Sequence, residues 1–232
     1  MTCLALHVTE AQGSVAVGRR DGTVWASEFA AQGDKAPILL QQIERLLARA
    51  EVALENIDTI AVTTGPGSFT GIRIGLATAQ GLALGRGWRL FACDSLKAVA
   101  AAQQAGGPPV AVVLDARRDE VYAALYDRTS KGPPRERIAP QCASPAAAAV
   151  AIAAACGPRE SFWIVGSGAA LVVPALVAAG AAANPAPAAA RTVAAALIDL
   201  VRDGGCGPVA AADLEPIYLR LSDAESKRGL RA

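Results

Sequence analysis

The chain has one histidine among 232 residues, and this scarcity excludes several kinds of site. A zinc peptidase of the HExxH type needs two histidines on one helix, whereas this chain has only His7. A Ser-His-Asp hydrolase would have to use His7 as its base, and Ser68 does not lie in the GxSxG turn of such enzymes. A Walker A loop is excluded because no Gly-Lys-Ser/Thr follows a glycine-rich turn. The sequence therefore predicts no catalytic residues and no metal ligands.

Aromatic residues are also scarce, at 4% of the chain, and 22 Lys and Arg nearly balance 21 Asp and Glu. We therefore expect a core of Leu, Val, Ile and closely packed Ala. A protein that binds nucleic acid by itself usually has an excess or a stripe of basic residues. The nearest candidates are Arg117-Arg118 and residues 227–231, so direct nucleic-acid binding is the weakest hypothesis.

Long hydrophobic runs and paired cysteines are missing as well. No apolar run of membrane-spanning length is free of Pro, Gly or charge, and residues 1–4 lack the features of a signal peptide. The five cysteines show no CxxC spacing and are interpreted as small buried hydrophobes in a reducing compartment: Cys3, Cys93, Cys142, Cys156 and Cys206. We expect a cytoplasmic protein without membrane contact.

The apolar pattern predicts two successive units with the same order of elements, separated at Gly106-Gly107-Pro108-Pro109. In the first unit, residues 1–105, we expect strands at 4–8, 14–17, 23–26, 57–62 and 88–92, and helices at 37–50, 71–84 and 95–103, the last capped by Ser95. In the second, residues 106–232, we expect strands at 110–114, 121–126, 135–139 and 162–165, and helices at 144–157, 171–179 and 192–201.

This duplicated order is typical of α/β proteins of the ribonuclease-H-like and actin-like class, in which two lobes, each with a mixed sheet flanked by helices, bind nucleotide in the cleft between them. The second lobe is expected to be smaller, with a C-terminal helix and tail that can pack back on the first.

The stretch Thr63–Gly75 leaves a β-branched run and enters a helix through three glycines and a proline. Such a turn places several amides at the positive end of a helix dipole, where they can hold a phosphate. It can equally be a tight turn between a buried strand and a buried helix, and both interpretations stay open. The candidate phosphate-loop residues are Gly65, Gly67, Ser68, Phe69, Thr70 and Gly71.

Two further loops would converge on the cleft of an actin-like protein. The loop after the first strand normally supplies an aspartate beside a metal, but His7 stands there, and hard cations prefer oxygen ligands. Thr9 and Glu10 could substitute, although loss of the metal is the favoured interpretation. The second-lobe loop carries Asp115 and Arg117 at a strand end, either as part of the site or as a charged turn.

Small residues recur every fourth position in the helix after the glycine turn, at Ala77, Gly81 and Gly85. Because glycine inside a helix costs about 1 kcal/mol relative to alanine, the stripe indicates close approach of another backbone, from the chain's own sheet or from a second subunit. Together with a Leu-rich helix at 37–50, it predicts a docking surface comprising Leu39, Ile43, Leu46, Arg73, Ala77, Gln80 and Gly81.

Three motifs in the same order closely resemble the bacterial TsaB (YeaZ) family: Thr64–Gly75 with Ala79–Ala83, Leu114–Tyr122, and Leu214–Arg220. The resemblance implies an actin-like fold with a degenerate nucleotide site and no catalytic activity of its own. It implies docking of the catalytic paralogue TsaD through the first-lobe helices, a TsaE ATPase as a further partner, and tRNA contact through this complex. It also implies homodimers when alone, no required cofactor, and ATP or ADP binding only in the assembled complex.

The chain departs from the family pattern at His7-Val8, where Asp-Thr is usual, and at Gly33–Ala36, just before the first helix. The leading hypothesis is a scaffold that docks a TsaD-type enzyme and supports threonylcarbamoyladenosine modification of tRNA. The alternative is an active actin-like ATPase or kinase, or a glycoprotease-like peptidase. The glycine loop and Asp115 support this alternative.

Overall fold

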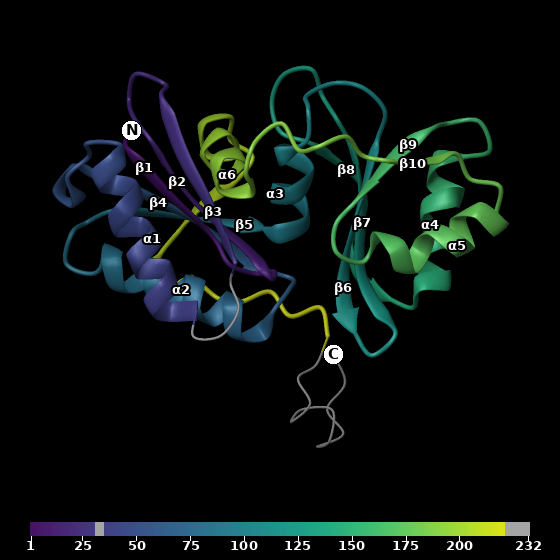
Figure 1. The fold of residues 1–232 in the computed structure, drawn as a ribbon, viewed down its shortest axis with the longest axis horizontal. Helices are drawn as coiled ribbons and strands as arrows, with labels where there is room; N and C mark the ends of the chain where they lie inside the picture. The colour runs from purple at the N-terminus through teal and green to yellow at the C-terminus, as the bar shows by residue number, and fades with distance from the viewer. Residues whose placement is uncertain (31–34, 221–232) are drawn as a thin grey trace.

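The computed structural model describes residues 1–30 and 35–220, which form two lobes side by side, each built on one β-sheet (Figure 1). The first sheet has the order β11-β5-β4-β1-β2-β3 and comprises β1 (Cys3–His7), β2 (Gln12–Gly18), β3 (Val24–Ala30), β4 (Thr59–Gly65), β5 (Arg89–Asp94) and β11 (Gly207–Val209). The second has the order β10-β9-β6-β7-β8 and comprises β6 (Val110–Arg117), β7 (Glu120–Asp127), β8 (Arg135–Ala143), β9 (Phe162–Val165) and β10 (Ala183–Pro185).

Both sheets are mixed, because each begins with antiparallel strands and continues with a parallel crossover. Strand β1 is antiparallel to β2 and parallel to β4, and β6 is likewise antiparallel to β7 and parallel to β9. The helices are α1 (Lys35–Arg49), α2 (Phe69–Ala83), α3 (Ser95–Ala102), α4 (Pro145–Cys156), α5 (Ala169–Ala178) and α6 (Val193–Arg202).

Helices cover both faces of the first sheet, with α1 and α2 on one face and α3 and α6 on the other (Figure 1). The residues of β1 explain this arrangement, because successive side chains of a strand point to opposite faces of the sheet. Leu4 and Leu6 join the core under α1 and α2, whereas Cys3 and Ala5 join the core under α6. The small side chains on that second face let α6 lie close to the sheet.

The second sheet is covered on its outer face by α4 and α5 and on its inner face by α3, which reaches it from the first lobe. Leu96 and Val99 of α3 pack with Val112 and Leu114 of β6 in one buried cluster. The chain then returns after residue 192, so that α6 and β11 belong to the layers of the first lobe.

The expected fold class is confirmed, and the predicted elements occur in the expected order, but the short strands β10 and β11 were not predicted. The helices expected from Ser144 and Thr192 do begin there, with these two residues as the caps of α4 and α6. The predicted cap of α3 was wrong by one residue. Asp94 is the cap, with its side chain accepting a hydrogen bond from Lys97 N at 2.8 Å, and Ser95 is the first helical residue, its hydroxyl buried. The departure at residues 33–34 and the basic stretch at 227–231 lie outside the described residues.

Candidate functional site

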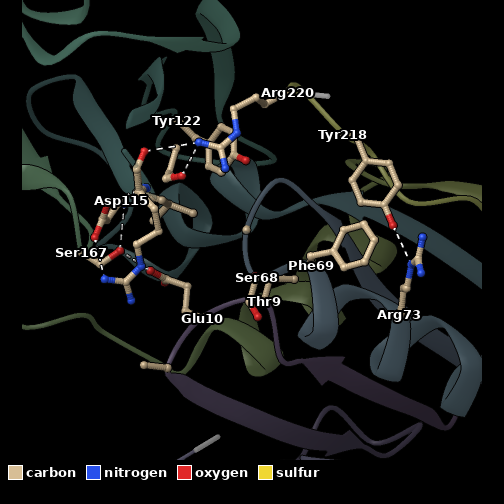
Figure 2. Close-up of a pocket in the computed structure, with 15 residues that line it drawn as sticks. Thr9, Glu10, Ser68, Phe69, Arg73, Asp115, Tyr122, Ser167, Tyr218 and Arg220 are labelled. Carbon is tan, nitrogen blue, oxygen red and sulfur yellow. Dashed lines mark hydrogen bonds and ion pairs between the residues drawn. The ribbon is translucent and has the colours of Figure 1, made fainter. Parts of the chain in front are cut away.

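A cleft of about 790 Å³ lies between the two lobes (Figure 2). It is lined by the loops that follow β1, β4 and β9, by the start of α2, by the C-terminal end of β6 and by one residue of β7. Two residues of the segment 214–220, called the C-terminal segment below, complete the lining. This is the position, between the lobes, that the duplicated order of elements predicts for a site.

The glycine loop after β4 packs tightly against its own chain. The backbone N–H of Ser68 donates to the carbonyl oxygen of Thr9 at 2.6 Å, and the Ser68 hydroxyl accepts from Gly71 N at 3.3 Å as the cap of α2. A Cβ on Gly67 would lie 2.8 Å from the Cβ of Thr9 and closer still to its carbonyl oxygen. Close packing against Thr9 therefore explains why this position is a glycine, without any need for a bound phosphate.

The C-terminal segment lies over the other end of the same loop. A Cβ on Gly65 would come within 2.6 Å of the carbonyl oxygen of Ile217. The rings of Phe69 and Tyr218 stack with centroids 5.3 Å apart. The Arg73 guanidinium lies 3.9 Å from the Phe69 ring centroid, and its Nε donates to the Tyr218 hydroxyl at 3.0 Å (Figure 2). The loop is thus held between the β1 loop and the C-terminal segment.

His7 does not reach the cleft. It is 2% exposed, and its Nδ1 lies 3.2 Å from the Thr63 hydroxyl, with burial lowering its pKa to about 4. The imidazole is therefore neutral near pH 7 and part of the first-lobe interior. The expectation that the residue at this position faces the cleft was wrong, because β1 ends two residues before the lining begins at Thr9 and Glu10.

The C-terminal end of β6, just before the turn into β7, brings two predicted residues into the cleft. The Asp115 carboxylate accepts from Arg117 N at 2.7 Å and pairs with the Arg117 guanidinium at 3.2 Å. Arg117, Arg118 and Asp119 all have left-handed backbones, with φ of 63°, 56° and 57°. Such a conformation costs roughly 1–2 kcal/mol per residue, so the turn that meets the cleft is strained.

Five of the eight candidate loop residues line the cleft together: Gly67, Ser68, Phe69, Asp115 and Arg117. Gly65, Thr70 and Gly71 do not line it. The prediction that the glycine loop and the Asp115 loop converge is therefore confirmed in geometry, while the packing described above favours the tight-turn interpretation of the glycines.

A polar bridge across the cleft was missed by the sequence reasoning. The Ser167 hydroxyl donates to the Glu10 carboxylate at 2.8 Å and accepts from Asp115 N at 3.2 Å, which joins the two lobes. Burial raises the pKa of Glu10, and the Ser167 hydrogen bond opposes this shift. A Cβ placed on Gly168 would lie only 2.8 Å from the Leu114 carbonyl carbon, so the loop that carries Ser167 lies directly against β6. This contact joins distant segments, and no local pattern reveals it.

The cleft also contains Tyr122 and Arg220, which sequence reasoning noted only within the motifs of the family resemblance. The Arg220 guanidinium pairs with Glu120 at 3.1 Å, as Arg117 pairs with Asp115, so positive charge in the cleft is largely matched by carboxylates. Within residues 1–30 and 35–220, no group of three or more His, Cys, Asp or Glu is placed to hold a metal ion.

A nucleoside triphosphate is a poor match for this cleft. Its phosphates would need free amides at the glycine loop, yet Ser68 N and Gly71 N already donate within the chain. They would also face the carboxylates of Glu10 and Asp115, which repel them unless a cation intervenes. The amides of Ser68 and Gly71 are therefore not available to a phosphate chain, and the Ser68 hydroxyl is engaged as a helix cap.

The predicted docking residues divide into two groups. Leu39, Ile43 and Leu46 are at most 4% exposed and pack in the first-lobe core, so their assignment to a partner surface was wrong. Their spacing forms the stripe by which a surface helix faces its own protein. Ala77 and Gly81 lie on the exposed side of α2. Two further predicted residues of α2, Arg73 and Gln80, hold the C-terminal segment.

Comparison with known proteins agrees with this description. A family model for TsaD, tRNA N6-adenosine threonylcarbamoyltransferase, matches residues 30–161, more than half of the chain. The Escherichia coli tRNA threonylcarbamoyladenosine biosynthesis protein TsaB is 36% identical over 134 residues, which cover 57% of this chain and 58% of that protein. The chain spans about half the length of the curated relatives it matches.

Solved structures cover more of the chain. A Pseudomonas aeruginosa protein described as similar to the peptidase YeaZ superposes with a TM-score of 0.78 at 28% identity, covering 94% of this chain and 99% of that one. Component A of the Acidaminococcus fermentans (R)-2-hydroxyglutaryl-CoA dehydratase gives a TM-score of 0.50 at 11% identity, covering 88% and 99%, which is a likeness of fold alone.

Fold and cleft together define a two-lobed α/β protein with an actin-like fold, in which segments of both lobes converge on one site. Within that class, the chain belongs to the TsaB/YeaZ family. In the part of the chain that the structure describes, no helix is both long and apolar enough to cross a membrane.

Proposed function

We propose that this chain is a non-catalytic scaffold subunit in threonylcarbamoyladenosine modification of tRNA, and that it docks a TsaD-type transferase. Its relatives are named as biosynthesis proteins of this modification, which supports the pathway. The buried His7 and the capping role of Ser68 support the absence of a catalytic set. The same proposal includes a cytoplasmic location, a TsaE-type ATPase, tRNA contact through the complex, and self-association when alone. It includes no cofactor of its own.

The exposed side of α2 is the observation that carries the docking proposal. A Cβ on Gly81 would have no atom within 4 Å, so the chain's own sheet does not require this glycine. Leu84 just beyond the helix is 78% exposed, and Leu40 on the neighbouring α1 is 50% exposed. A helix-interior glycine beside exposed leucines fits a surface that another helix approaches closely. The docking face is therefore proposed to comprise Leu40, Ala77, Gly81 and Leu84.

The test is co-expression with the TsaD-type paralogue from the same genome, followed by size-exclusion chromatography and calorimetric titration. Ala77→Trp adds bulk to the proposed face, and Ala154→Trp adds the same bulk to an exposed position of α4 in the other lobe. We expect the wild type and Ala154→Trp to form the complex and Ala77→Trp to lose it.

A wild-type chain that forms no complex under any nucleotide condition would refute the scaffold proposal. Equal complex formation by both tryptophan variants would refute the proposed face. Metal-dependent nucleotide hydrolysis by the purified chain, abolished by Asp115→Ala, would favour an active ATPase or kinase instead.

A further inference from the structure

The two lobes are joined covalently along one side only. The connection 103–109 and the return 186–192 both cross there, on the side shown at the top of Figure 1. Ala190 N donates to the Ala102 carbonyl at 3.0 Å, and the Arg128 side chain donates to the Pro108 carbonyl at 2.7 Å. These contacts tie the two connections to their neighbours, so this side would act as the hinge if the lobes moved apart.

The C-terminal segment crosses on the opposite side, shown at the bottom of Figure 1, and its Tyr218 and Arg220 line the cleft. Its first-lobe end is firmly anchored. Leu214 is 4% exposed within the first-lobe core, and its carbonyl and that of Ala211 accept from the Gln80 side chain at 3.4 and 2.8 Å. Ile217 N donates to the Thr64 carbonyl at 2.8 Å, which ties the segment to the C-terminal end of β4.

The other end of the segment lies on the second lobe. Leu219 packs against the inner core of that lobe, and Arg220 donates to the carbonyls of Ala116 and Arg117 at 2.8 and 3.3 Å. Arg220 also pairs with Glu120 at 3.1 Å, and its side chain is 28% exposed. The segment thus bridges the whole cleft, from a buried anchor on one lobe to a partly exposed arginine on the other.

We propose that residues 214–220 form a strap that holds the two lobes closed over the cleft and that releases at its Arg220 end. The hinge lies opposite, so once the second-lobe contacts of the strap are lost, opening of the cleft breaks the Ser167–Glu10 hydrogen bond but no backbone connection. The direction of release follows from the unequal anchors: the first-lobe end is buried and bonded through its backbone, whereas the second-lobe end depends on a guanidinium that water can reach.

The strap also touches the helix on which docking is proposed. Arg73 and Gln80, which hold the strap, lie on α2 beside Ala77 and Gly81. A partner that covers this face would contact the strap, so docking and cleft closure would influence each other. This coupling rests on the proposed function, but the strap itself is tested on the chain alone and stands or falls without any partner.

The experiment measures the distance between lobes by pulsed electron resonance. Spin labels are attached to non-natural side chains at Glu44 of α1 and Val150 of α4, both exposed, so that the native cysteines are untouched. Arg220→Gln removes the strap's second-lobe contacts. Arg202→Gln is the matched control, because Arg202 is 29% exposed and donates to the Arg19 carbonyl at 2.9 Å within the first lobe.

We expect the wild type and Arg202→Gln to give the same narrow distribution and Arg220→Gln to give a broader one with a longer mean. Glu120→Gln, which leaves the strap sequence intact, should shift the distribution in the same direction by less, and it covers the case in which Arg220→Gln fails to fold. Folded variants at both positions with the wild-type distribution would overturn the proposal. So would a roughly tenfold loss of exchange protection at the Ile217 amide in Arg220→Gln, because the first-lobe anchor should hold; that factor corresponds to one lost hydrogen bond.

Discussion

Two glycines in α2 should respond in opposite ways to the same substitution. A methyl group at Gly81 would meet no atom within 4 Å, so Gly81→Ala gains helix propensity without any clash. Alanine is favoured over glycine in a helix by about 0.8–1.0 kcal/mol, and we expect the chain to become more stable by about that amount. At Gly75 the added carbon would lie 3.1 Å from Val8 Cγ2 and 3.5 Å from Val62 Cγ2. Overpacking of this kind typically costs about 1–3 kcal/mol. In Gly75→Ala this cost should cancel or outweigh the gain of about 1 kcal/mol in helix propensity.

Thermal and denaturant unfolding of the isolated chain measure both effects. For a chain of 232 residues, a change of 1 kcal/mol corresponds to roughly 2–4 °C in Tm. We expect Gly81→Ala to raise Tm by about that amount and Gly75→Ala to leave it unchanged or lower it. If Gly81→Ala is neutral or destabilising at concentrations where the chain is monomeric, the exposed face of α2 has been misassigned.

A larger side chain at Gly81 should affect the stability of the chain and the binding of a partner in opposite directions. Leucine has nearly the helix propensity of alanine, so Gly81→Leu should also stabilise the isolated chain. Its side chain would, however, fill the space into which a partner helix is proposed to approach. We therefore expect weaker binding of the TsaD-type partner from a more stable protein. Unchanged affinity would show that Gly81 lies outside the interface, even if its effect on stability is as calculated.

Three further predictions concern the interior. Burial lowers the pKa of His7 from 6.5 to about 4, so between these pH values the unfolded chain binds more protons than the folded chain. The free energy of unfolding should therefore fall by at most about 3 kcal/mol as the pH drops from 6.5 to 4. Unfolding measured across this pH range should differ by this amount between the wild type and His7→Asn. Burial raises the pKa of Asp94 to about 6, so above that pH the folded chain carries this charge at a cost relative to the unfolded chain. At pH 8, Asp94→Asn should therefore match or exceed the wild-type Tm, whereas Asp94→Ala should lose about 1 kcal/mol with the cap. Gly67→Ala should lose at least about 2 kcal/mol through its clash with Thr9, whereas Gly22→Ala, which also has a positive φ but nothing within 4 Å, should lose about 1 kcal/mol in denaturant titrations.

The order of elements was predictable because it depends on local signals. Ser144 before Pro145 and Gly157 after the alanine run begin and end α4 as expected, and a β-branched run precedes the glycine loop. Asp94 was missed as a cap because the adjacent Ser95 is an equally good candidate by residue type. Only the backbone path decides between two neighbouring caps, and that path is set by the end of β5.

The predicted docking residues show a different limit of prediction from sequence. An apolar stripe at helical spacing predicts a buried face, but it does not say which surface buries it. Leu39, Ile43 and Leu46 are buried by the chain's own sheet, and the exposed Leu40 lies between them in sequence. The strap was beyond sequence reasoning for another reason. Its contacts join residues more than 100 positions apart, such as Arg220 and Ala116, and no local pattern encodes them.

The glycine loop connects the cleft, the strap and the docking helix through its own packing. Gly67 lies against the β1 loop, Gly65 lies under the strap, and Ser68 caps α2, which carries the exposed face to Gly81. The strap therefore contacts the start of α2 directly, where Phe69 stacks on the ring of Tyr218. Because a packed helix moves as a unit, a partner that fixes α2 would also fix this contact. Gly65 and Gly67 are required because a side chain at either position would clash with the strap or with the β1 loop. Their role is therefore to permit this close packing rather than to bind a phosphate.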